Sequence, residues 1–240
     1  MFIPVSDENP LKSIQFQFVT VGLIAINVLV FALTATGVDQ SWISSFAVRP
    51  SELFLVNVIG GPADMSSDQV AVPEAYTLIS YMFFHGDIWH LLGNMIFLWV
   101  FGDNVEDAVG HIKFLFFYLA CGVIAALTHA YIVEGTELAS VPLIGASGAV
   151  AGVIAAYLML HPRVRVWVLA FKVFPLQISA AIVLGLWVIT QVAMVLMPQV
   201  GGQNPVAWWA HIGGLAAGAI LIVLFKRPDV PLFDRGFAQR

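Results

Sequence analysis

Long apolar segments are the feature of this chain that most restricts its fold. A helix needs about 20 mostly apolar residues to cross the hydrocarbon layer of a membrane. The sequence offers such segments at residues 16–35, 88–101, 112–133, 143–160, 176–197 and 206–225. The second is short unless it begins near Tyr81, which makes it 81–101. Only 10% of the residues are charged, whereas soluble domains have about 25%. We therefore expect an all-α membrane protein, with six spans in one domain over residues 1–240 and the lipid bilayer as its surroundings.

The remaining composition excludes several classes of protein. The net charge of −5 is modest and no basic patch is present, which argues against nucleic acid as a partner. Cys121 is the only cysteine, so no internal disulfide can form, and it lies in an apolar run where it is expected to pack as a small hydrophobe. The long connection between the first two spans is apolar at residues 42–59, and we expect it to lie on or dip into the membrane surface.

Basic residues orient the predicted spans. Nine of the ten Lys and Arg fall on the side that holds both termini, and only Arg49 falls on the other. Positive charge marks the cytoplasmic side of a membrane protein. This asymmetry predicts a multi-pass protein of a cell (inner) membrane with both termini in the cytoplasm.

Polar residues of separate spans then converge at one depth. Ser147 lies about four residues into the fourth span and His211 about five into the sixth, so both are roughly 6–8 Å below the extracytoplasmic boundary. His85, His90 and Asn94 cluster at the same end of the second span, and the last two share a helix face. Polar groups at membrane depth are functional candidates by default.

Small residues adjoin the serine and the histidine. Gly148 and Gly152 form a small-xxx-small face on the fourth span, and Gly214 and Gly218 form another on the sixth. Such faces let helix backbones approach closely in lipid. Close packing would bring Ser147 and His211 together, although glycines in a span can also serve packing alone.

A serine and a histidine in contact can form a nucleophile and its general base. No Asp or Glu lies within the apolar core of any predicted span, so we predict a Ser147–His211 dyad without a buried acid. The backbone N–H of Ser147 and the side chains of His90 and Asn94 are candidate donors to an oxyanion. The plainer alternatives are a serine bonded to its own helix and an asparagine that links helices. A metal on His85 and His90 is disfavoured by their spacing and by the lack of an acidic ligand, so no metal and no cofactor are expected.

With these residues in place, the chain resembles the rhomboid intramembrane serine proteases, in particular a bacterial-type six-span core, over residues 75–225. GASG at 145–148 resembles the family's Gly-x-Ser-Gly nucleophile motif, and AHIGG at 210–214, followed by Gly218, resembles the segment with the catalytic histidine. HGDIWHLLGN at 85–94 resembles the block with the oxyanion residues His90 and Asn94. FGDNVEDAVG at 101–110 resembles the motif that closes the second span, in which Glu106 is structural.

The resemblance implies a six-helix bundle whose site opens to the extracytoplasmic side. It implies hydrolysis of peptide bonds in or next to the transmembrane segments of protein substrates. Gly145, Gly148, Gly214, Gly218, His85 and Glu106 would support the catalytic residues. The fifth span would form a movable gate and residues 198–205 a cap over the site.

One departure concerns the histidine. The family often carries an aromatic residue four positions after the serine, stacked on the catalytic histidine, and Ala151 stands there instead. Tyr157 or an aromatic elsewhere is expected to position His211. The alternatives to a protease are a non-catalytic rhomboid-like binder of membrane helices and a small transporter with His90 and His211 as a proton relay.

Overall fold

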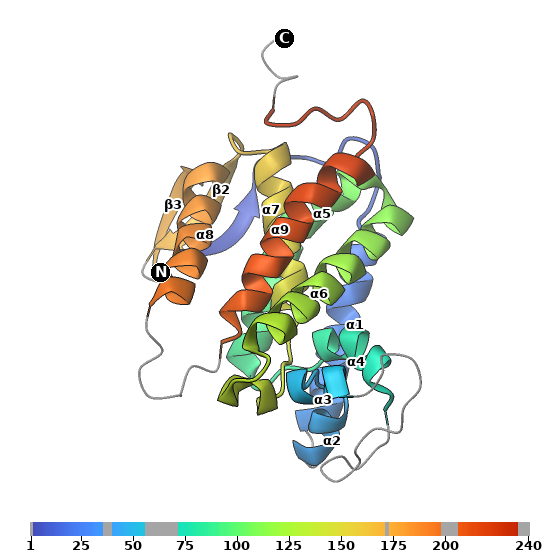
Figure 1. The fold of residues 1–240 in the computed structure, drawn as a ribbon. Coiled ribbons are helices and arrows are strands. Elements are labelled where there is room, and N and C mark those ends of the chain that lie inside the picture. Colours follow the sequence, from blue (N-terminus) through green and yellow to red (C-terminus); the bar gives the residue numbers. More distant parts are fainter. Residues whose placement is uncertain (1, 36–39, 56–71, 171–172, 198–205, 235–240) are drawn as a thin grey trace.

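The computed structural model describes residues 2–35, 40–55, 72–170, 173–197 and 206–234, and these residues are mostly helical (Figure 1). The longer helices are α1 (Phe18–Ala35), α5 (Ile88–Val109), α6 (His111–Val133), α7 (Ser147–Leu160), α8 (Ala180–Leu196) and α9 (Trp208–Phe225). The shorter helices α2 (Gln40–Ser45), α3 (Pro50–Leu55) and α4 (Glu74–Ser80) gather at the end of the bundle away from the C-terminus. Two 3-10 turns, Tyr81–Phe83 and Glu137–Ser140, precede α5 and α7.

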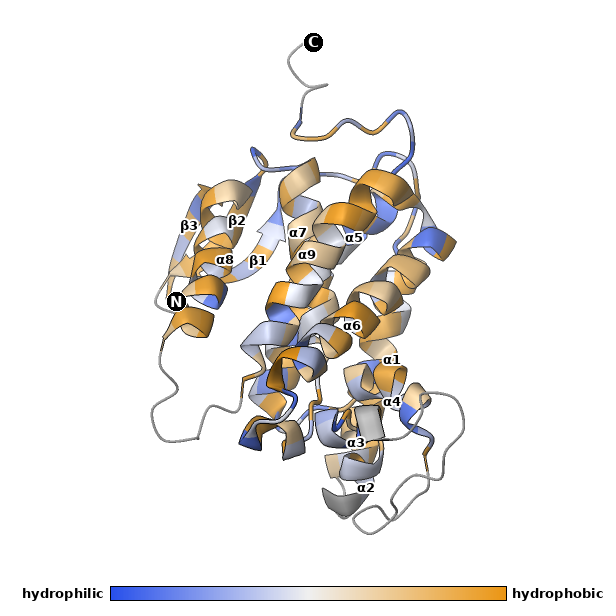
Figure 2. Cartoon of the chain, in the orientation of Figure 1, coloured by the Kyte–Doolittle hydropathy of each residue, from blue (hydrophilic) through white to orange (hydrophobic). Residues whose placement is uncertain are grey.

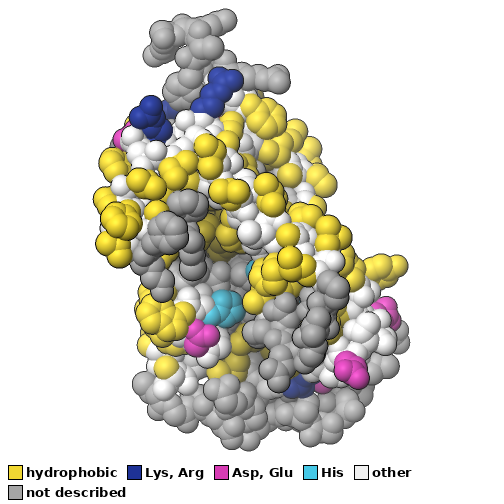
Figure 3. All heavy atoms as spheres, turned by 90° about the vertical axis from the view of Figure 1, so that its left-hand side faces the viewer, with side chains coloured by type: hydrophobic (Ala, Val, Ile, Leu, Met, Phe, Trp, Pro, Cys, Tyr) yellow, Lys and Arg dark blue, Asp and Glu magenta, His cyan; other side chains and the backbone are white. Residues whose placement is uncertain are grey.

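The helices have the surface of a membrane protein. In the part of the chain that the structure describes, α1, α6 and α9 are long and apolar enough to cross a membrane, whereas α7 and α8 are apolar but shorter. On α1, Leu29 and Leu33 are 59% and 60% exposed, which is costly in water but not in lipid. Apolar residues run along the helices (Figure 2). On the side of the molecule with α8 they cover much of the described surface, and Lys and Arg lie mainly at the end near the C-terminus of the chain (Figure 3). The helical membrane fold is therefore confirmed, and the count of six spans stays a prediction.

Helix α5 begins at Ile88, the later of the two starts considered for the second span, and ends eight residues beyond the predicted Phe101. Its start is set by Asp87, whose carboxylate accepts the backbone N–H groups of Trp89 and His90 at 2.8 and 2.9 Å. Such a cap satisfies amides that have no partner within the helix. Tyr81–Phe83 is a separate 3-10 turn. The helix ends at Val109 because Gly110 adopts a φ of 89°, a conformation that favours glycine.

Helix α7 begins at Ser147, four residues after the predicted start of the fourth span. Its 14 residues span about 21 Å, which is less than the roughly 30 Å of a bilayer core. Most of its side chains are buried among α5, α6 and α9, so α7 is the central helix of the bundle (Figure 1). Because α7 is shorter than a bilayer core is thick, its first residue need not lie at the membrane boundary, and Ser147 is half-buried.

A three-stranded antiparallel sheet corrects the expected all-α class. Its order is β1 (Phe2–Asp7), β2 (Arg165–Ala170) and β3 (Phe174–Ser179). Residues 176–179, predicted as the start of the fifth span, therefore lie in a strand, and α8 begins at Ala180. Alternate side chains of β2 are buried, at Val166, Val168 and Ala170, which is the period of a strand with one covered face.

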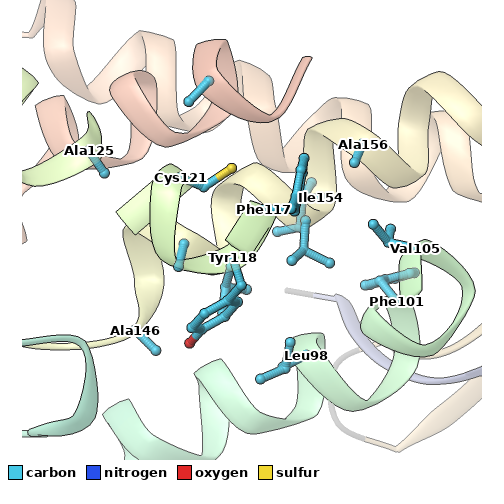
Figure 4. Packing of buried hydrophobic residues seen from close by; sticks show 14 of the residues in the cluster. Leu98, Phe101, Val105, Phe117, Tyr118, Cys121, Ala125, Ala146, Ile154 and Ala156 are labelled. Atoms are coloured by element: carbon cyan, nitrogen blue, oxygen red, sulfur yellow. The ribbon is translucent and has the colours of Figure 1, made fainter. Parts of the chain in front are cut away.

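The hydrophobic core lies where α5, α6 and α7 meet (Figure 4). Phe101 of α5, Phe117 and Tyr118 of α6 and Ile154 of α7 are fully buried there. Cys121 is also buried, as expected for a small hydrophobe, and its Sγ would lie 2.5 Å from a Cβ added to Gly152. The core therefore holds α7 at the centre of the bundle.

Glycines allow α7 and α9 to touch through their backbones. A Cβ added to Gly214 would lie 2.0 Å from the carbonyl oxygen of Gly148, and one added to Gly218 would lie 2.1 Å from that of Gly152. Real Cβ atoms do not approach a backbone oxygen this closely, so any other residue would push the two helices apart. The glycine pairs named from the sequence thus face each other across one interface.

Some sequence expectations lie outside the described residues. These are the cap at 198–205, the end of the apolar connection at 56–59, and the basic residues Lys172, Arg235 and Arg240. The described part of the connection folds into α2 and α3, and α3 packs against α6. Its Val48 forms a β-bridge with Leu143, just before α7.

Gly214→Ala should destabilise the bundle because its methyl group would overlap the carbonyl oxygen of Gly148. We expect a loss of about 1–3 kcal/mol, as for overpacking in a protein interior. Thermal unfolding in detergent measures this loss. Gly185→Ala on α8 is the matched control, since a Cβ there meets nothing within 4 Å. Equal melting temperatures for the two variants would contradict the proposed backbone contact.

Candidate active site

Ser147 is the first residue of the central helix, and a tight loop presents it. The loop is anchored on both sides: the N–H of Gly145 donates to the carbonyl oxygen of Tyr81 at 2.9 Å, and Leu143 pairs with Val48. Gly145 has a φ of 111°, which L side chains rarely adopt. Ser147 itself is half-buried. Its backbone N–H belongs to the first turn of α7, where amides have no partner within the helix.

His211 lies in the first turn of α9, opposite Ser147. Its Nε2 is 2.9 Å from the Ser147 Oγ, which is hydrogen-bond distance. The imidazole is buried, with 8% of its surface exposed. The backbone contact between Gly148 and Gly214, one and three residues further along their helices, accounts for this short distance.

The other side of His211 is held by residues that the sequence analysis did not identify. Its Nδ1 is 2.7 Å from the Oε1 of Gln191 on α8. The indole of Trp208 meets the imidazole edge-on at a centroid distance of 5.7 Å, and Trp187 of α8 lies at 5.9 Å with a tilt of 36°. One polar group and two aromatic rings therefore enclose the histidine.

Tyr157 does not position His211, contrary to one expectation. Its hydroxyl is hydrogen-bonded to Asp7 of β1, and its ring contacts Phe101 and His161. Ten residues of helix separate it from Ser147, a rise of about 15 Å. Tyr157 thus joins the central helix to the sheet at the opposite end. The aromatic contacts of His211 come from Trp187 and Trp208 instead.

His85, His90 and Asn94 lie beside the loop that leads to Ser147. The Asn94 Nδ2 is 3.0 Å from the His85 Nε2, and the Ala146 N–H reaches the same nitrogen at 3.5 Å. Because an amide nitrogen and a backbone N–H only donate, the His85 Nε2 is the acceptor of both. The rings of His85 and His90 are 5.0 Å apart. His85 therefore ties Asn94 to the loop, and one hydrogen of the Asn94 amide remains for another acceptor.

His90 packs directly against Gly145. A Cβ added to Gly145 would lie 2.6 Å from both the Cε1 and the Nε2 of His90. Two features therefore require glycine at position 145: its backbone conformation, and the His90 imidazole that leaves no room for a Cβ. His90 is partly buried, whereas Asn94 and His85 are buried.

Glu106 lies near the far end of α5, about 18 Å along the helix from Asn94. Its carboxylate accepts the backbone N–H groups of Val19 and Thr20 at 3.0 and 2.8 Å and contacts the His111 Nδ1 at 2.5 Å. A buried carboxylate at the start of a helix satisfies free amides and complements the helix dipole. Glu106 thus secures the start of α1 and takes no part in the cluster around Ser147.

Two nearby residues escaped the sequence analysis. Gln191 carried a usable signal, since it is a polar residue inside the predicted span at 176–197. His129 of α6 is the second; it is buried, and it was not among the residues singled out from the sequence. Among the described residues, no group of three or more His, Cys, Asp or Glu is arranged to hold a metal ion.

Comparison with known proteins identifies the family. The Rhomboid domain model matches residues 72–228, which include every residue of the site described above. The chain therefore belongs to the Rhomboid family. It is 26% identical over 223 residues to RHOMBOID-like protein 12, mitochondrial, of Arabidopsis thaliana, a match that covers 88% of this chain and 59% of that protein.

Two further relatives match over shorter regions. Rhomboid protein 1, mitochondrial, of Saccharomyces cerevisiae is 31% identical over 103 residues, which are 42% of this chain and 30% of that protein. Presenilin-associated rhomboid-like protein, mitochondrial, of Homo sapiens is 28% identical over 159 residues, which are 66% of this chain and 37% of that protein. The matches thus span well under two thirds of each relative's length.

These relatives contradict the expected location in a bacterial-type cell membrane. All three carry a mitochondrial location in their names. The distribution of Lys and Arg distinguishes the two ends of the helix bundle, but it does not identify the compartment that each end faces. The assignment of a cell (inner) membrane with cytoplasmic termini was therefore wrong.

Gly145→Ala should destabilise the loop before α7 by more than the strain of an alanine at a positive φ accounts for. The added methyl group would have to displace the His90 imidazole, at an expected cost of about 1–3 kcal/mol. Thermal unfolding in detergent is the measurement. Gly135→Ala is the control, because Gly135 also has a positive φ, of 74°, but open space around its Cβ. If both variants melt at the same temperature, the contact with His90 does not constrain the loop.

Proposed function

We propose that this protein is an intramembrane serine endopeptidase that hydrolyses peptide bonds in or next to the transmembrane segments of other proteins. The observation that carries the proposal is the 2.9 Å contact between the Ser147 Oγ and the His211 Nε2. A serine hydroxyl is a weak nucleophile and becomes reactive when a base accepts its proton. Membership of the Rhomboid family supports the same activity.

The reaction follows from the positions of these two groups. The Ser147 Oγ attacks the carbonyl carbon of the scissile peptide bond while its proton passes to the His211 Nε2. The tetrahedral intermediate collapses, the C–N bond breaks, and His211 delivers the proton to the leaving nitrogen. Water, deprotonated by the same imidazole, then hydrolyses the Ser147 ester and restores the serine. A positioned base of this kind contributes about 10²–10⁴-fold to the rate.

The developing oxyanion needs donors on the Ser147 side of the site. The free hydrogen of the Asn94 amide, the His90 imidazole and the backbone N–H of Ser147 are the candidates. His85 supports this role because it holds Asn94 by one hydrogen bond and leaves its second hydrogen available. Each lost donor of an oxyanion hole costs roughly 10²–10³ in kcat.

The surroundings favour a substrate that arrives from the membrane. The exposed apolar side chains of the helices require a lipid bilayer, and we propose that α1, α5, α6, α7, α8 and α9 form a six-span bundle in a single domain of this chain. The recessed start of α7 would place Ser147 inside that bundle, within reach of a transmembrane segment. The names of the relatives support a mitochondrial membrane as its location.

Ser147→Ala should abolish cleavage and leave the fold intact, because it removes the nucleophile and only one half-buried hydroxyl. The measurement is cleavage of a panel of single-span proteins in vesicles, with the cut mapped by mass spectrometry. Thermal unfolding of the variant controls for misfolding. Turnover retained in the variant would refute the nucleophile assignment, and a wild-type chain that binds the panel without cutting it would indicate a helix-binding protein instead.

Asn94→Ala should slow cleavage by about one to three orders of magnitude, as expected for a lost oxyanion donor. The loss should fall on kcat, because the oxyanion exists only during the reaction. Leu92→Ala on the exposed side of the same helix is the control and should cleave normally. A kcat equal to that of the wild type would assign Asn94 to packing.

A further inference from the structure

Gln191 is an uncharged polar side chain buried in an otherwise apolar helix. Only 4% of its surface is exposed, and it faces α9 from the fourth turn of α8. A buried amide without partners costs free energy in an apolar environment. The contacts of the Gln191 side chain therefore indicate its role in α8.

The two ends of the Gln191 amide can be told apart by their partners. The Nε2 lies 3.0 Å from the carbonyl oxygen of Trp187, and a carbonyl oxygen can only accept a hydrogen bond. The nitrogen must therefore point to that carbonyl. Thr190 fits the same arrangement, because its hydroxyl donates to the Trp187 carbonyl and can accept from the Gln191 Nε2 at 3.1 Å.

This orientation leaves the Gln191 Oε1 facing the His211 Nδ1 at 2.7 Å. An amide oxygen only accepts, so the Nδ1 must carry a hydrogen. A neutral imidazole has one N–H, so its Nε2 is bare and faces the Ser147 hydroxyl. That is the form of the ring that can take the serine proton.

We propose that Gln191 is a positioning residue that fixes His211 in its base-competent tautomer, an inference that rests on the proposed protease function. Gln191 would take the place of the acid that orients the histidine in a Ser-His-Asp triad. An uncharged amide avoids the cost of an ionised carboxylate at membrane depth. Trp187 and Trp208 restrict the orientation of the imidazole through ring contacts. Gln191 determines which of its nitrogens holds the hydrogen.

The acceptor and the base belong to different helices. His211 lies on α9, and Gln191 reaches it from α8, whose Trp187 also meets Phe97 of α5 at 6.1 Å. The tautomer of His211 therefore depends on α8 being packed against α9. Gln191→Glu preserves an acceptor oxygen at this position, and Gln191→Leu preserves the volume but removes the acceptor.

The test combines kinetics with a spectroscopic signature. Gln191→Leu should lower kcat by roughly 10- to 100-fold with little change in KM, the range found for hydrogen-bond partners of metal-binding histidines. Gln191→Glu should retain more of kcat. Val192→Ala, at an exposed position on the same helix, should behave as wild type. Equal losses in the Leu and Glu variants, or a wild-type kcat in Gln191→Leu, would overturn the proposal.

The ¹⁵N NMR shifts of the His211 ring give a second readout that needs no turnover. In the wild-type chain the Nδ1 should show the shift of a protonated nitrogen and the Nε2 that of a bare one. A proton on the Nε2 would overturn the proposal even if Gln191→Leu fails to fold. The proposed function fails separately, if Ser147→Ala cleaves as the wild type does.

Discussion

The contact between the backbones of α7 and α9 is the constraint on which the site depends. Gly148 and Gly152 meet Gly214 and Gly218 so closely that a single methyl group would overlap a carbonyl oxygen. In lipid, helix association relies on such packing rather than on the hydrophobic effect. Because Ser147 immediately precedes the first glycine pair, the same contact brings its hydroxyl to the imidazole on α9. The contact between Ser147 and His211 is thus a consequence of how the two helices pack.

The type of side chain that makes hydrogen bonds in this interior follows its position along the helices. Carboxylates lie near helix ends, where Asp87 caps α5 and Glu106 secures α1. Deeper in the bundle the hydrogen bonds are made by uncharged side chains, such as the amides of Asn94 and Gln191. This division follows from the cost of a charge in an apolar medium, which a neutral amide avoids. The proposed dyad, with Gln191 beside His211, would therefore avoid the cost of an ionised carboxylate at membrane depth.

The sequence predicted the site better than it predicted the elements around it. Polar residues on separate spans and the glycine pairs beside them were sufficient to bring Ser147 and His211 together, because few polar groups are tolerated at that depth. The strands were missed because β1 pairs with β2 across more than 150 residues, a contact that no local pattern records, and because the apolar run at 174–179 resembles the start of a span. The sequence left the start of α5 open between Tyr81 and Ile88, and the cap at Asp87 decides it. Gln191 was visible in the sequence, but only the structure shows that it faces the histidine.

The most direct measurement is the covalent reaction of Ser147 with a fluorophosphonate, located by mass spectrometry of the digested protein. The wild-type chain is predicted to carry the adduct on Ser147, and His211→Ala, folded to the same thermal stability, is predicted to carry almost none. That difference would demonstrate that the imidazole on α9 activates the serine on α7. Equal labelling of the two proteins, or no adduct on Ser147 in the wild type, would contradict the account.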